Sequence, residues 1–202
     1  MINRPKYKLA RRLGAGLFEK TQSQKFALRE GRRAETKGRP RAKSEFGLQL
    51  LEKQKARYNY GIGERQFAKY VAEALAKKGS KTEEVLFERL ETRLDNVVYR
   101  MHLAPTRQAS RQMVSHGHIT VNDVRITIPS YNVKVGDKVK IREASAKKAL
   151  FANLADKLKD THPPSWLTFD PEKRAGDVQG KPKFIKSELL FDMAAVLEFY
   201  RR

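Results

Sequence analysis

The chain has 202 residues, with 43 Lys and Arg against 23 Asp and Glu, so its formal net charge is +20. Because it contains no cysteine, it cannot form disulfides, thiolate zinc sites, cysteine-held iron–sulfur clusters or a cysteine nucleophile. It also has no run of about 18 uncharged apolar residues, so we expect no membrane span and no membrane partner. The excess positive charge predicts a polyanionic partner, with nucleic acid first among them.

The positive charge is unevenly distributed along the chain. Residues 1–60 carry +12, residues 61–90 carry +1, residues 91–160 carry +6 and residues 161–202 carry +1. Such clustering favours phosphate binding over a mixed, solubilising surface, although a purely solvated tail is an alternative for residues 1–43. The first 18 residues also fit an organellar transit peptide, but they are poor in serine and lack a long apolar stripe, which favours a mature basic arm.

Helical periodicity dominates the first half of the chain. The run Arg29–Lys43 contains two glycines, a proline and seven basic residues, which predicts a basic loop. Ser44 is placed to cap the helix that follows. From the apolar spacing we expect helices at residues 45–58 and 65–78, and a longer one from Ser80 or Thr82 to Met101.

A corner and a second helix follow at Ala104-Pro105. Proline disfavours helical geometry in the residue before it, and Thr106 can cap a helix that runs through Val114 and stops at Gly117. On this helix Arg107 and Arg111 are one turn apart, so both guanidinium groups can project from one face.

After Gly117 the apolar period changes from 3.6 to 2, which predicts a small antiparallel sheet. Strands are expected around residues 119–121, 124–128 and 138–142, with turns at Asn122-Asp123 and Gly136-Asp137. The fold class is therefore α+β. Further on, we expect helical character at residues 143–159, a hairpin starting near Trp166, loop and turns at residues 171–182, and a terminal helix at residues 188–202 that docks onto an earlier element.

The sequence offers little for catalysis or for metal or cofactor binding. Gly14-Ala15-Gly16 lacks the third glycine and the preceding strand of a nucleotide-binding loop. His116 and His118 have no third ligand nearby, so a metal site is not expected. Arg93-Leu94-Asp95 is similar to the catalytic triplet of some pseudouridine synthases, but an apolar helical stripe follows it instead of a polar turn. We therefore expect no enzyme, no cofactor and no metal.

The segment from Leu94 to Asn122 resembles the RNA-binding module named after ribosomal protein S-four. The resemblance rests on Leu94-Asp95-Asn96-Val97-Val98-Tyr99-Arg100, Thr106-Arg107, Ala109-Ser110-Arg111-Gln112, Val114-Ser115-His116-Gly117-His118-Ile119 and Val121-Asn122. Further motifs, such as Glu64-Arg65-Gln66-Phe67, Pro129-Ser130-Tyr131 and Pro164-Ser165-Trp166-Leu167, are similar to those of the bacterial-type ribosomal protein itself. The resemblance covers most of residues 44–202.

This resemblance implies a structural component of the small ribosomal subunit. Such a protein binds 16S rRNA at a multi-helix junction of the 5′ domain and nucleates assembly of the subunit body. It lies beside ribosomal proteins S-five and S-three near the path of incoming mRNA, and it contributes to translational accuracy. The expected location is the small ribosomal subunit of the cytoplasm, with an organellar ribosome left open.

The resemblance also implies three parts of the chain and a set of RNA-binding residues. The parts are a basic N-terminal arm and loop at residues 1–43, a helical domain at 44–91 completed by helix 188–202, and an RNA-binding module at 92–187 with a hairpin extension. The helix pair would contact RNA through Arg93, Arg100, Arg107, Arg111, Gln112, His116 and His118. Further expected contacts are Arg4, Lys6, Lys8, Arg11, Arg12, Lys53, Lys55, Arg57, Tyr58, Arg65, Gln66, Asn122, Ser130 and Tyr131.

Some features depart from the family pattern or leave alternatives open. The four zinc-binding cysteines of many relatives are absent, so the N-terminal segment must fold by packing and RNA contact. Tyr58 could stack on a base or pack against a neighbouring helix. The competing functions are an RNA-modifying enzyme that uses Asp95, and a free RNA-binding protein of the heat-shock type.

Overall fold

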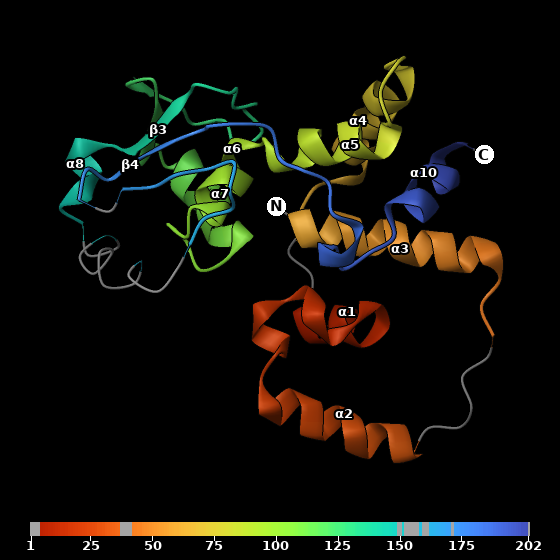
Figure 1. The fold of residues 1–202 in the computed structure, drawn as a ribbon. Helices are drawn as coiled ribbons and strands as arrows, with labels where there is room; N and C mark the ends of the chain where they lie inside the picture. Colours follow the sequence, from red (N-terminus) through yellow and green to blue (C-terminus); the bar gives the residue numbers. More distant parts are fainter. Residues whose placement is uncertain are drawn as a thin grey trace. The chain divides into compact units, whose positions relative to one another are not determined.

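The structure is a computed structural model, which describes residues 5–36, 42–148, 151, 158, 162–170 and 172–201 (Figure 1). The chain divides into two compact units. The first comprises Met1–Glu83 and Ile185–Arg202, and the second comprises Glu84–Phe184. None of the helices in the described ranges is long and apolar enough to cross a bilayer.

The first unit begins with short helices where a basic arm was expected. They are α1 (Lys6–Leu13), the 3₁₀ turns η1 (Ala15–Leu17) and η2 (Glu19–Thr21), and α2 (Gln24–Thr36). The prediction of a loop from Arg29 was wrong for residues 29–36, which continue α2, while residues 37–41 lie outside the described ranges. Arginine, glutamate and alanine favour helix, and they outweigh the cost of about 1 kcal/mol for Gly31.

Contacts between α1 and α2 hold this N-terminal pair together. The Tyr7 and Phe26 rings stack with centroids 5.8 Å apart, and Arg11 Nε donates to Glu30 Oε1 at 2.8 Å. Phe26 and Leu13 are buried. In a segment without metal-binding cysteines, aromatic packing and an ion pair are among the contacts that hold the described helices together.

The remaining helices of the first unit are α3 (Glu45–Tyr60), α4 (Glu64–Ala76) and α10 (Met193–Arg201), with the 3₁₀ turn η4 (Lys186–Glu188). Ser44 caps α3 by accepting from the Gly47 amide at 3.2 Å, as its sequence position predicts. Gly61 ends the helix in a left-handed conformation with φ 63°. The terminal helix α10 lies against α3 (Figure 1), where Phe46 and Phe199 pack with centroids 5.4 Å apart.

The second unit contains helices and one sheet, which confirms the α+β class. Its helices are α5 (Thr82–Glu91), α6 (Leu94–Arg100), α7 (Arg107–Ser115) and the short α8 (Glu143–Ala146). Its strands are β1 (Ile119–Val121), β2 (Val124–Arg125), β3 (Lys138–Ile141) and β4 (Ala175–Asp177). They form an antiparallel sheet in the order β2-β1-β3-β4, with Thr120 opposite Lys140 and Val139 opposite Gly176.

The single helix predicted from residue 82 to residue 101 is in fact two helices. The chain becomes extended at Arg93, with φ −65° and ψ 135°, and α6 starts at Leu94. The interruption lets Leu94 and Asp95 donate their amides to the carbonyls of Tyr131 and Pro129, at 2.8 and 3.1 Å. Sequence periodicity missed this break because its partner lies about 35 residues downstream.

The sheet also differs in detail from the prediction. The predicted strand 124–128 ends at Arg125, and Ile128 is exposed. The predicted hairpin is confirmed by the bridges Leu167–Val178 and Asp170–Ala175, but β4 occupies part of the predicted loop 171–182. The strand was missed because Ala175-Gly176-Asp177 has no apolar alternation. Of the predicted helix 143–159, the described residues include α8 and little beyond it.

One hydrophobic core joins the helix pair to the sheet. Leu94, Val97 and Val98 of α6 are fully buried beside Val114 of α7 and Ile119 and Val139 of the sheet. Trp166 packs against the same core. The core fixes α6 and α7 to the sheet and thereby sets the positions of their polar side chains.

Candidate nucleic-acid interface

The α6–α7 corner brings the predicted arginines into one polar network. Thr106 caps α7 by accepting from the Ala109 amide at 3.1 Å, and it fixes where α7 begins. Arg107 and Arg111 then extend from successive turns toward α6. Arg107 Nε donates to Asn96 Oδ1 at 2.8 Å, and Arg111 Nε donates to Asp95 Oδ2 at 2.7 Å.

Asp95 is held between two arginines. Arg93 donates to it from Nε at 3.0 Å and from Nη2 at 2.8 Å, while Arg111 Nη2 lies 2.6 Å from Oδ2. The Arg93 and Asp95 side chains are each only 3% exposed, whereas Arg111 is 17% exposed. A buried carboxylate with both oxygens occupied is structural, which contradicts the alternative in which Asp95 is catalytic.

A second buried carboxylate, Glu91, organises the other side of the network. Arg100 donates to both of its oxygens, at 2.8 and 3.0 Å, and Asn96 Nδ2 donates to Oε2 at 3.0 Å. Arg107 also stacks over Tyr99, with its guanidinium carbon 4.4 Å from the ring centroid. These contacts fix the orientation of planar guanidinium groups whose remaining N–H donors can bind phosphate.

The network separates the predicted arginines into two groups. Arg93 lies in the interior at 2% exposure, a placement that argues against direct RNA contact. Arg100, Arg107 and Arg111 are partly exposed, and their carboxylate or amide partners lie beneath them in the fold. Gln112, one residue further along α7, is exposed.

The turn after α7 carries the two predicted histidines in different environments. His116 is exposed, whereas His118 is 9% exposed and its Nδ1 lies 2.9 Å from Ser145 Oγ. Burial, followed by the positive charges of Lys148, His116, Arg125 and Arg142, lowers the pKa of His118 from its ordinary value of 6.5. His118 therefore serves as a neutral packing group more readily than as a cationic contact.

The other predicted contacts in the second unit lie on the loops of the sheet. Asn122 has φ 50° in the β1–β2 turn, where its side chain donates to Asp137 at 2.8 Å and accepts from the Lys138 amide at 2.9 Å. Ser130 and Tyr131 are half-buried, and Tyr131 packs against the core. The observed contacts explain how Asn122 and Tyr131 stabilise these loops. Contacts of Asn122, Ser130 and Tyr131 with RNA remain predictions.

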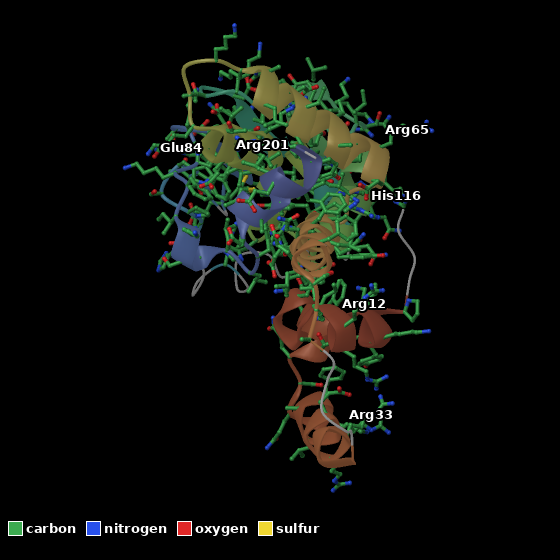
Figure 2. All side chains as sticks on the ribbon, turned by 90° about the vertical axis from the view of Figure 1, so that its right-hand side faces the viewer. Arg12, Arg33, Arg65, Glu84, His116 and Arg201 are labelled. Carbon is green, nitrogen blue, oxygen red and sulfur yellow. The ribbon has the colours of Figure 1, made fainter. Side chains whose placement is uncertain are left out.

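On α3, the predicted basic residues are already paired with carboxylates. Lys53 is only 6% exposed; its Nζ lies 2.9 Å from Glu64 Oε1 and 4.2 Å from the Phe199 ring centroid. Arg57 Nη1 lies 2.6 Å from the other Glu64 oxygen, and Lys55 pairs with Glu52. Among the predicted residues nearby, Tyr58 is half-buried, Gln66 donates to Tyr70, and Arg65 is exposed (Figure 2).

The N-terminal helices carry the least compensated charge of the first unit. Lys8 and Arg12 are exposed on α1, Lys6 is half-buried and Arg11 pairs with Glu30, while Arg4 lies outside the described residues. The predicted set omitted Lys25, Arg29 and Arg32 of α2, which are exposed at spacings of four and three residues. Helical spacing would have revealed this face, had the segment not been assigned to a loop. Figure 2 shows Arg12 and Arg33 on these helices.

A metal site finds no support in the described part of the chain. No group of three or more His, Asp or Glu side chains gathers there in a way that could hold an ion. His116 and His118 approach each other only at a ring-centroid distance of 6.0 Å.

Comparison with known proteins gives two family matches, which together cover residues 2–139. Residues 2–91 match the family described as "Ribosomal protein S4/S9 N-terminal domain", and residues 92–139 match the "S4 domain". The chain is 43% identical to the "Small ribosomal subunit protein uS4" of Roseiflexus sp. (strain RS-1), over 98% of this chain and 97% of that protein. It is 42% identical to the protein of the same description from Geobacillus stearothermophilus, with the same coverage.

Proposed function

We propose that this chain, which belongs to the uS4 family of small ribosomal subunit proteins, binds 16S rRNA at a multi-helix junction of the 5′ domain. Binding there would nucleate assembly of the subunit body. Family membership also supports the further proposals that it lies beside ribosomal proteins S-five and S-three, near the path of incoming mRNA, and contributes to translational accuracy.

The observation that carries the proposal is the contrast between cations held by carboxylates inside the fold and cations that reach its surface. Arg93, Lys53 and Arg57 have carboxylate partners and stabilise the protein. The exposed cations of α1 and α2, together with partly exposed Arg107 and Arg111, form surfaces suited to phosphate. Recognition would then depend on RNA shape and backbone charge, with little reading of base sequence.

The proposal is tested by filter binding of the full chain to a transcript of the 16S 5′ domain. A 23S rRNA fragment of equal length serves as the control for nonspecific binding. If about six to ten phosphates are neutralised, affinity should fall by roughly 10³–10⁵ between 50 and 200 mM salt. A flat salt response, or equal affinity for both transcripts, would contradict the proposal.

Placement in the ribosome is tested separately in cells. Tagged protein should sediment with small subunits through a sucrose gradient. It should also stay bound through a high-salt wash, because a component built into an assembled subunit does not exchange freely, unlike the isolated chain bound to a transcript. A free RNA-binding protein of the heat-shock type would be released by that wash.

A further inference from the structure

A group of cations surrounds the turn His116-Gly117-His118 in the second unit. Arg125 comes from β2, and Arg142 and Lys148 flank α8, so residues separated by up to 32 positions converge there. All three side chains are exposed, and in the described ranges none of them forms an ion pair with a carboxylate. None of them belongs to the predicted RNA-binding set.

Gly117 allows Arg125 to approach the turn closely. Gly117 has φ +71°, and a Cβ atom at this position would collide with the guanidinium group of Arg125. Arg125 Nη2 also lies 3.5 Å from the His116 carbonyl oxygen, at the outer limit of a hydrogen bond. The Arg125 guanidinium therefore lies against the turn. The neighbouring His116, labelled in Figure 2, is exposed.

His118 ties α8 to the same turn. Its carbonyl oxygen accepts from the Arg142 amide at 2.9 Å, and its ring lies 2.9 Å from Ser145 Oγ. The side chains whose charges lower the pKa of the His118 ring include Lys148, Arg125 and Arg142, and these three are cationic. Among the described residues, no carboxylate belongs to this set, whereas in the α6–α7 network Asp95 and Glu91 balance the arginines.

We propose that Arg125, Arg142 and Lys148, gathered around the His116-Gly117-His118 turn, form a second phosphate-binding site for the RNA backbone. The inference rests on the proposed function, because it adds a contact to the same RNA. Uncompensated like charges repel each other in the free protein, and a phosphodiester group between them relieves that repulsion while accepting hydrogen bonds from the guanidinium groups. In this arrangement the module contacts RNA at two places, the α6–α7 corner and this turn.

The test removes three charges from the site in the full chain by R125Q, R142Q and K148Q together. The matched control removes three charges elsewhere by K77Q, K78Q and K186Q, all exposed positions. Binding to the 16S 5′ domain transcript is measured as a function of salt. Each phosphate contact contributes about 0.7–0.9 to the slope of log affinity against log salt concentration, so the site variant should lose about 2 from the slope. We expect affinity at 0.1 M salt to fall at least about tenfold, with little change in the control.

Several outcomes separate the two proposals. If the unmodified chain fails to bind the transcript, the proposed function fails. If it binds steeply with salt but the site variant behaves like the control, the second site is refuted and the proposed function stands. Thermal unfolding followed by Trp166 fluorescence checks folding. Should the triple variant unfold, the double variant R142Q/K148Q, which keeps Arg125 on Gly117, should still lose more than 1 from the slope, and an unchanged slope refutes the site.

Discussion

The Arg93–Asp95–Arg111 triad leads to a quantitative prediction about stability. Replacing Asp95 by leucine removes the carboxylate that pairs with Arg93, and the Arg93 charge stays buried with its side chain only 3% exposed. Breaking a buried ion pair in this way costs about 3–5 kcal/mol. Arg111→Ala should cost less, about 1–2 kcal/mol, because Arg111 is partly exposed and Asp95 keeps its bidentate contact with Arg93.

The double variant R93M/D95L distinguishes a buried-charge effect from simple loss of contacts. With both charges gone, no ion is left desolvated, and apolar replacements of a buried pair are often close to neutral. We therefore expect R93M/D95L to be more stable than D95L, although it carries one more substitution. Arg111 loses its contact with Asp95 in both variants, so that loss cancels in the comparison.

Urea unfolding of the full chain, followed by Trp166 fluorescence, measures these differences. Trp166 is the only tryptophan and packs on the same core as Leu94 and Val97, so it reports on the second unit. With a slope of about 2 kcal/mol per M, D95L should lower the unfolding midpoint by about 1.5–2.5 M. The reasoning is refuted if D95L unfolds at the wild-type midpoint, or if R93M/D95L is less stable than D95L.

Three further predictions concern the stability of the folded chain: one on packing in the second unit, one on its loss in acid, and one on its pH dependence near pH 6.5. Gly176→Ala should destabilise the protein by about 1–3 kcal/mol, because the added Cβ would lie 2.9 Å from Met101 Cε and closer still to a backbone oxygen. Gly180→Ala is the control: nothing lies within 4 Å of the added Cβ, so its free energy of unfolding in urea should be close to that of the wild type. Burial raises the pKa of Glu64, but hydrogen bonds from Tyr200 and Lys53 outweigh this effect, so the net pKa is lowered from 4.5. Stability should therefore fall as the pH drops below 4.5, and the free energy of unfolding of E64Q should depend less on pH in this range. Burial lowers the pKa of His118 from 6.5, so the unfolded chain binds its proton first, and wild-type stability should fall below pH 6.5 more steeply than that of His118→Gln.

How far the sequence predicts the structure depends on whether the determining contact is local. Ser44 and Thr106 were predicted as helix caps, and both cap, because a cap depends on residues within one turn. The break at Arg93 was missed because it depends on carbonyl groups at Pro129 and Tyr131, which the local apolar period does not encode.

The same distinction applies to the candidate site. Sequence spacing placed Arg107 and Arg111 on one face, and the structure brings both against α6. Sequence spacing did not reveal that Lys53 is buried against Phe199, because that ring belongs to α10, about 145 residues further along the chain. Arg125 was overlooked because it reaches the histidine turn only through the β1–β2 pairing.

A formal charge of +20 therefore does not show which cations are available to RNA. Arg93 and Lys53 count toward the total, yet each is buried against a carboxylate and would release few counterions on binding. Arg125 and Lys148 have no such partner among the described residues, so no described carboxylate offsets their charges when a phosphate approaches. Buried ion pairs stabilise the fold, so substitutions at Arg93 or Lys53 should change the urea midpoint of unfolding. Exposed cations determine how many counterions are released, so substitutions at Arg125 or Lys148 should change the slope of log affinity against log salt concentration.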